Sequence, residues 1–78
     1  MKIIEVTWHD ITSYSSWYAK ADAAKLENTE VRSVGYLLNR GKKDVRIAMS
    51  DSRAKPGEYG VIKVIPRGTI TNIREVSS

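Results

Sequence analysis

The sequence predicts a mainly β (α+β) fold, a small antiparallel barrel of about five strands with one helix after the first strand. Two observations support this prediction. Residues 31–76 contain runs of alternating and β-branched side chains separated by turn-rich segments, as in a meander of short strands. Residues 16–27 contain four alanines among strong helix formers. Since no linker divides the 78 residues, residues 1–78 are expected to form a single domain.

The first strand is predicted over residues 2–8. Successive side chains of a strand point to opposite faces, so Ile4, Val6 and Trp8 share one face. This apolar face is expected to point into the core. Residues 9–10 are expected to end the strand, and a polar connection then leads to the helix.

The helix is predicted over residues 16–27, where a serine can cap its first N–H groups. Asn28 is expected to stop it in a left-handed conformation. Its apolar positions lie on two opposite faces, which favours packing against the sheet and against a neighbouring subunit. Because the chain has no Phe, Trp8 and Trp17 are expected to supply much of the core.

The other four strands are expected at residues 31–38, 45–49, 59–65 and 69–76. In the second of these, Val45, Ile47 and Met49 alternate onto one face. Gly41 is expected to supply the positive φ of a tight reversal. Pro66 cannot donate a ladder hydrogen bond, so it is expected to end its strand or lie at a sheet edge. Residues 50–57 form the most turn-prone loop.

Composition narrows the class of protein. With no cysteine and no cluster of metal-ligating residues, neither a disulfide, a metal nor a cofactor is expected. No apolar run approaches 18 residues and no signal peptide is seen, so no membrane partner is expected. The predicted location is cytoplasmic, and it is the host cytoplasm if a phage encodes the chain. So small a chain gains core by association, which predicts a homo-oligomer.

The formal net charge of +4 conceals an asymmetry. Residues 1–30 hold three lysines against five acids, a charge of −2, whereas residues 31–78 hold ten lysines and arginines against four acids, a charge of +6. A basic surface attracts anions such as nucleotides and nucleic acid. A solvated face that serves solubility is the alternative interpretation.

Catalysis is not expected, and no catalytic residue is assigned. His9 and Asp10 are adjacent and would point to opposite faces of a strand, so they cannot easily form a relay. One histidine and no cysteine leave little for nucleophilic or metal-assisted chemistry. The serines of residues 50–52 flank an aspartate, an arrangement typical of turns.

Binding is the better-supported class of function. Every aromatic residue here carries a polar atom, and such rings stack on bases while Arg or Lys holds a phosphate. Arg67, beside the bare backbone of Gly68, is the candidate anion clamp, and Arg53 and Lys55 are candidates to close over the anion. A salt bridge or carbonyl cap is the structural alternative for Arg67, and solvated cations are the alternative for the loop. The candidate aromatic contacts are Trp8, Tyr14, Tyr18, Tyr36 and Tyr59.

Residues 65–73, Ile-Pro-Arg-Gly-Thr-Ile-Thr-Asn-Ile, resemble the second signature segment of Sm-like proteins, which makes the last corner of an SH3-like barrel. Pro66 departs from that pattern, and here the helix follows a strand instead of preceding all strands. The chain is also similar to small uncharacterised proteins encoded by phages and bacteria. The shared positions are Trp8, Asp10, Trp17, residues 34–37 (Val-Gly-Tyr-Leu) and residues 65–68 (Ile-Pro-Arg-Gly).

These resemblances imply an Sm-like, SH3-like barrel and a non-enzymatic function. The first hypothesis is a phage-type anti-defence sponge: a homo-oligomer that sequesters a nucleotide-derived signalling molecule of host immunity in pockets between subunits. The second is an Sm-like ring that binds single-stranded RNA. The third is a structural or protein-interaction adaptor, for which the alanine-rich helix would serve.

Overall fold

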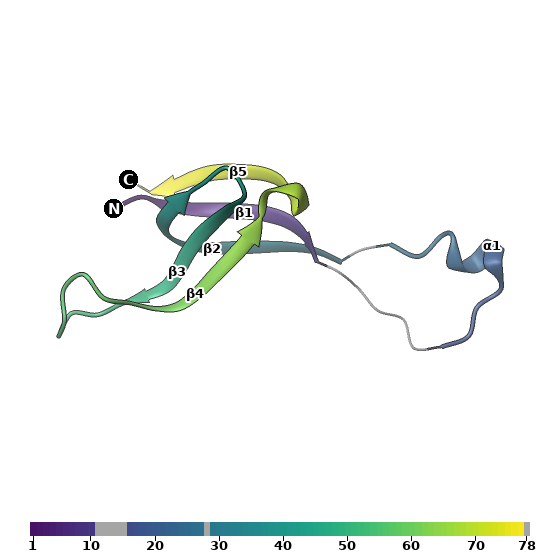
Figure 1. Cartoon of the computed structure of the whole chain (residues 1–78), viewed down its shortest axis with the longest axis horizontal. Coiled ribbons are helices and arrows are strands. Elements are labelled where there is room, and N and C mark those ends of the chain that lie inside the picture. The colour runs from purple at the N-terminus through teal and green to yellow at the C-terminus, as the bar shows by residue number, and fades with distance from the viewer. Residues whose placement is uncertain (11–15, 28, 78) are drawn as a thin grey trace.

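The computed structural model describes residues 1–10, 16–27 and 29–77. In this part of the chain, five antiparallel strands form one sheet, accompanied by one short α-helix (Figure 1). The elements are β1 (Ile3–Asp10), α1 (Lys20–Ala23), β2 (Thr29–Arg40), β3 (Asp44–Asp51), β4 (Tyr59–Pro66), the 3₁₀ helix η1 (Arg67–Thr69) and β5 (Ile70–Ser77). The strand order is β4-β3-β2-β1-β5, so β4 and β5 are the edges of a sheet that is not closed into a barrel.

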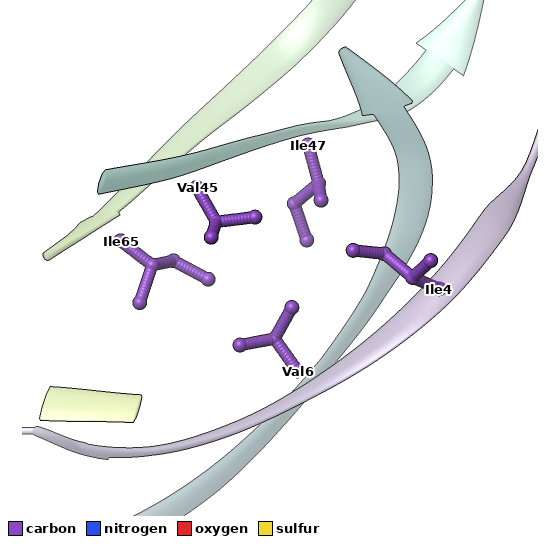
Figure 2. Close-up of a cluster of buried hydrophobic side chains, with 5 residues drawn as sticks. All are labelled: Ile4, Val6, Val45, Ile47 and Ile65. Atoms are coloured by element: carbon purple, nitrogen blue, oxygen red, sulfur yellow. The ribbon is translucent and has the colours of Figure 1, made fainter. Parts of the chain in front are cut away.

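Strand β2 joins the two halves of the sheet. It pairs with β1 as far as Tyr36, which also pairs with Ala48 of β3, and the pairing with β3 continues to Arg40. Gly35 lies where β2 changes partner, and a Cβ atom there would be 2.6 Å from the Ala48 carbonyl oxygen. Glycine therefore allows β2 to approach β3 closely enough to bend. The bend brings β3 and β4 over β1 (Figure 2).

The core fills the space between these halves of the sheet (Figure 2). Its buried side chains, each at most 2% exposed, are Ile4, Val6, Val45, Ile47 and Ile65. Trp8 is partly buried and packs against them. The predicted inward face of the first strand is thus confirmed. Full burial of one such aliphatic side chain stabilises the fold by about 1.5–3 kcal/mol.

The predicted helix over residues 16–27 is largely wrong, because α1 contains only residues 20–23. Every residue from 16 to 27 is exposed, and Trp17 is 101% exposed, so neither the packing of this helix on the sheet nor the core role of Trp17 is found. Alanine favours helix only weakly, and short helices need packing to persist. Here the segment extends away from the sheet (Figure 1) and gains no such packing. Asn28, the predicted stop, lies outside the described residues.

The expected strands are confirmed, with different ends: β1 continues to Asp10, and β2 is longer than residues 31–38 on both sides. Pro66 ends β4, an edge strand, as predicted. The positive φ predicted for Gly41 is wrong, because that conformation occurs among the described glycines at Gly57 (φ 90°). The reversal is held instead by the Gly41 N–H, which donates to the Asp44 carbonyl at 2.9 Å. Neither described helix is long and apolar enough to cross a membrane.

Candidate functional site

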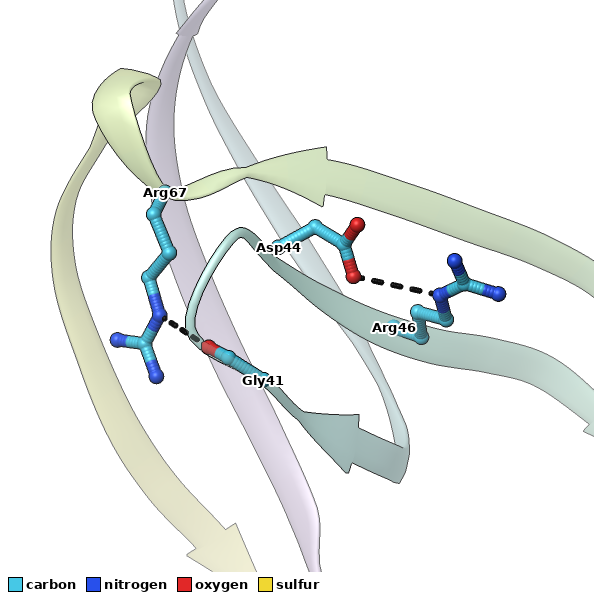
Figure 3. A network of polar contacts seen from close by, with 4 residues as sticks. All are labelled: Gly41, Asp44, Arg46 and Arg67. Carbon is cyan, nitrogen blue, oxygen red and sulfur yellow. Dashed lines mark hydrogen bonds and ion pairs between the residues drawn. The ribbon is translucent and has the colours of Figure 1, made fainter.

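Arg67 lies at the corner between β4 and β5 and is held against the turn between β2 and β3. Its backbone N–H donates to the Lys43 carbonyl at 2.9 Å, and its side-chain Nε donates to the Gly41 carbonyl at 2.9 Å (Figure 3). The carbonyl cap considered from the sequence is therefore present. The terminal nitrogens of the guanidinium have no hydrogen-bond partner within the part of the chain that the structure describes. Two donor groups of Arg67 thus remain available.

The two hydrogen bonds of Arg67 join its corner to the cation-rich segment of residues 40–46. We call this group the basic corner; its members are Arg40, Lys42, Lys43, Arg46 and Arg67. The acid of the turn is Asp44, whose Oδ1 lies 3.3 Å from the Nε of Arg46 (Figure 3). Five cations against one acid give this corner a net charge of +4. Lys42 and Lys43 are exposed, so the positive charge faces solvent.

The structure does not bring Arg53 and Lys55 to Arg67 within one chain. Both lie in the loop that precedes β4, whereas Arg67 follows its last residue. Eight strand residues at about 3.3 Å each separate the two ends by roughly 25 Å. The loop is closed on itself, since the Ser52 N–H donates to the Glu58 carbonyl at 3.0 Å. Arg53 and Lys55 are exposed at this far end.

The candidate tyrosines are dispersed. Tyr18 is exposed in the segment that extends from the sheet, and Tyr36 is half-buried in β2. Tyr59 is half-buried at the first residue of β4, the end opposite Arg67. Tyr14 lies outside the described residues. The structure thus places each described tyrosine on a different element and does not gather them around the anion clamp.

Trp8 belongs to a polar cluster that the sequence analysis missed, the Trp8–Ser33–Lys63 cluster. The Nε1 of Trp8 donates to the Ser33 Oγ at 3.0 Å, and the Nζ of Lys63 donates to the same oxygen at 3.3 Å. The Lys63 ammonium lies 5.8 Å from the centre of the Trp8 ring, within cation–π range. The available sequence signal was the alternation of β4, which gives Lys63 the same face as Ile65.

Arg74 is a further cation of the basic half, but it is committed to Glu5. Its Nε and Nη2 donate to the two carboxylate oxygens at 3.0 and 3.2 Å, across paired positions of β1 and β5. These hydrogen bonds, more than the opposite charge, hold the pKa of Glu5 below its ordinary value and raise that of Arg74. Arg74 therefore contributes to the sheet edge and is a poor candidate for ligand binding.

No group of three or more side chains able to hold a metal ion occurs in residues 1–10, 16–27 and 29–77, and the same residues enclose no pocket. Comparison of the chain with known protein families, with curated proteins and with solved structures found no match. Among the described residues, the basic corner and the Trp8–Ser33–Lys63 cluster are therefore the candidate binding sites.

Proposed function

We propose that this protein is a non-enzymatic, homo-oligomeric binding protein that takes up a compact nucleotide-type anion, as a phage-type sponge that sequesters an immune signalling molecule of the host. The observation that carries the proposal is the basic corner, where Arg67 is fixed beside Lys42 and Lys43 with two guanidinium nitrogens unengaged. A planar guanidinium fork matches the geometry of phosphate, as it does that of carboxylate.

In this proposal, the hydrogen bond from Arg67 to the Gly41 carbonyl prepares the arginine for ligand binding. Since Nε is already bonded to the Gly41 carbonyl, the guanidinium is oriented before a ligand arrives, and less side-chain entropy is lost on binding. Gly68 follows directly, and a Cβ atom there would meet no atom within 4 Å. An anion can therefore approach the backbone beside Arg67 closely.

The proposed assembly is a homo-oligomer that uses the edges of the sheet. β4 is an edge strand and exposes Val61, Ile62 and Val64, and an edge of this kind pairs readily with another chain. A pocket between subunits would let Arg53 and Lys55 of one subunit reach the basic corner of the next. The strand order, with η1 between β4 and β5, supports the further proposal that the chain is an open form of the Sm-like, SH3-like barrel.

Arg67→Ala tests the site. Charge-assisted hydrogen bonds contribute about 1.5–3 kcal/mol, so the variant should bind at least about tenfold more weakly by calorimetry with mononucleotides and cyclic dinucleotides. Arg67→Lys should restore binding only in part because the fork is lost. Arg32→Ala is the matched control, since Arg32 is an exposed arginine of β2 outside the basic corner. Equal affinity of Arg67→Ala and Arg32→Ala would exclude the basic corner as the site.

Salt dependence separates this proposal from single-stranded RNA binding, which the +6 charge of residues 31–78 also favours. An RNA-binding protein should bind an oligoribonucleotide better than short nucleotides, and its affinity should fall steeply with salt as counterions are released. A sponge should prefer the compact ligand at both of two salt concentrations. Failure to bind either class would leave the adaptor hypothesis.

Sedimentation equilibrium at micromolar concentration tests the proposed assembly, and a clean 8.8 kDa monomer would contradict it.

A further inference from the structure

A cation stands on the core-facing side of β4, away from the basic corner. Ile65 is buried and pairs with Val45, and two residues earlier Lys63 pairs with Ile47, which is also buried. Directly paired residues share a face of the sheet, so Lys63 shares the inner face. Apolar side chains occupy the neighbouring inner positions, whereas Lys63 remains exposed where the open sheet admits water.

Three strands contribute to the surroundings of this lysine. Trp8 comes from β1, Ser33 from β2 and Lys63 from β4, and the bend of the sheet brings them together. The Lys63 ammonium is 3.3 Å from the Ser33 Oγ and 5.8 Å from the centre of the Trp8 ring. The Trp8 indole N–H is fixed on the same hydroxyl at 3.0 Å. The cluster is therefore organised by side-chain hydrogen bonds and is more than a chance surface contact.

The hydrogen bonds of Ser33 are incomplete. A serine hydroxyl has two acceptor lone pairs and one hydrogen to donate. Both lone pairs are taken, because the indole N–H and the ammonium are donors only. No hydrogen bond donated by the Ser33 hydroxyl is found among the described residues, although Ser33 is only 4% exposed. The cluster thus offers the Ser33 O–H, which has no acceptor among the described residues, together with two further ammonium hydrogens of the solvent-exposed Lys63.

We infer that the Trp8–Ser33–Lys63 cluster is a phosphate-binding subsite, in which a nucleotide phosphate accepts hydrogen bonds from Lys63 and Ser33 while the base lies against the Trp8 ring. An oxyanion supplies the acceptors that the cluster lacks, and an aromatic base matches the indole face. This inference rests on the proposed function for its ligand class but concerns a separate place. Lys63 precedes Arg67 by four residues, about 13 Å along β4.

Intrinsic fluorescence gives a direct test, because the chain has two tryptophans and Trp17 is fully exposed. Trp17→Phe leaves Trp8 as the sole indole fluorophore. In this background, adenosine monophosphate should change the Trp8 emission saturably, inorganic phosphate should compete more weakly, and adenosine should have little effect. Absence of a saturable change with either adenosine monophosphate or phosphate would overturn the inference.

Variants of the cluster show which side chains the change in Trp8 fluorescence depends on. Lys63→Met keeps the aliphatic stem and should weaken the response at least about tenfold, whereas Lys63→Arg should retain most of it. Ser33→Ala should weaken it without removing the charge, which keeps the test decisive if Lys63→Met folds poorly. Lys25→Met, which replaces an exposed lysine outside the cluster, is the control and should bind as the parent does. Equal affinities of Lys63→Met and Lys25→Met would refute the subsite.

The same background separates this inference from the proposed function. Arg67→Ala should lose calorimetric binding at the basic corner while the Lys63-dependent Trp8 response remains. If the Trp8 response depends on Lys63 but Arg67→Ala binds normally, the basic corner fails and the subsite stands. If Arg67→Ala alone reduces binding, the subsite fails and the proposed function stands.

Discussion

Replacing Gly35 with alanine should destabilise the fold where β2 bends from β1 to β3. The new Cβ would lie 2.6 Å from the Ala48 carbonyl oxygen, 3.2 Å from the Ala48 carbonyl carbon and 3.3 Å from the Ile47 Cβ. Two of these atoms are backbone, and both Ala48 and Ile47 are fully buried. No flexible side chain can therefore move aside, and the clash is relieved only by separating β2 from β3.

The expected loss of unfolding free energy follows from two opposing effects. Overpacking a tight interior costs about 1–3 kcal/mol, and a backbone clash places Gly35→Ala at the upper end of that range. Alanine also restricts the unfolded chain, which returns about 0.4–1 kcal/mol. The net loss should be about 2 kcal/mol, which lowers the melting temperature of a domain this size by roughly 8–16 °C.

Urea and thermal unfolding followed by far-ultraviolet circular dichroism measure this loss. Gly60→Ala is the matched control, because Gly60 also lies in a strand and its new Cβ would meet only the Ser50 Cβ, at 3.9 Å. The control should change the unfolding free energy by no more than about 0.5 kcal/mol. If the two variants are equally stable, the account of the bend at Gly35 is wrong.

Further substitutions test the core, the ion pair of Glu5 with Arg74 and the extended segment. Ile47→Ala should reduce the unfolding free energy by about 2–5 kcal/mol, and Leu26→Ala, at an exposed position outside the sheet and its proposed interface, by much less; similar losses would contradict the assigned core. Arg74 lowers the folded-state pKa of Glu5 below its ordinary value of 4.5. The pairing of Glu5 with Arg74 therefore stabilises the fold fully when the pH is above 4.5, and this stabilisation is lost as the pH falls through the lower folded-state pKa. Urea midpoints of Glu5→Gln and the parent should therefore converge in acid, and a difference that stays constant to pH ~2 would refute the coupling. Trp17→Ser should leave monomer unfolding within about 0.5 kcal/mol of the parent, and a larger loss would show that Trp17 has a partner in the chain.

Local patterns in the sequence predict the strands because alternation is itself local. Ile4, Val6 and Trp8 reveal the inner face of β1, and Pro66 marks the end of an edge strand. The same reasoning fails for Trp17, since an apolar side chain does not indicate whether the folded chain offers it a partner. It also misses the role of Gly35, whose close neighbour Ala48 lies on another strand.

The candidate site was predictable in part. The position of Arg67 at a corner follows from the residues around it, whereas its hydrogen bond to the Gly41 carbonyl depends on a turn 26 residues away. Ser33 and Lys63 meet across 30 residues through the bend in the sheet, which no local pattern encodes. The cationic side chains of Arg53 and Lys55 suggested that they bind the same anion as Arg67. In the fold, however, the whole length of β4 separates these two residues from Arg67.

Native mass spectrometry of protein purified from cells tests the central proposal most directly, because it reports assembly and retained ligand together. We expect multiples of the 8.8 kDa chain carrying a discrete added mass of nucleotide size. The added mass should be lost from Arg67→Ala while the oligomer persists. Bare monomers would contradict both parts of the proposal, and a heterogeneous added mass of RNA length would favour the RNA-binding alternative.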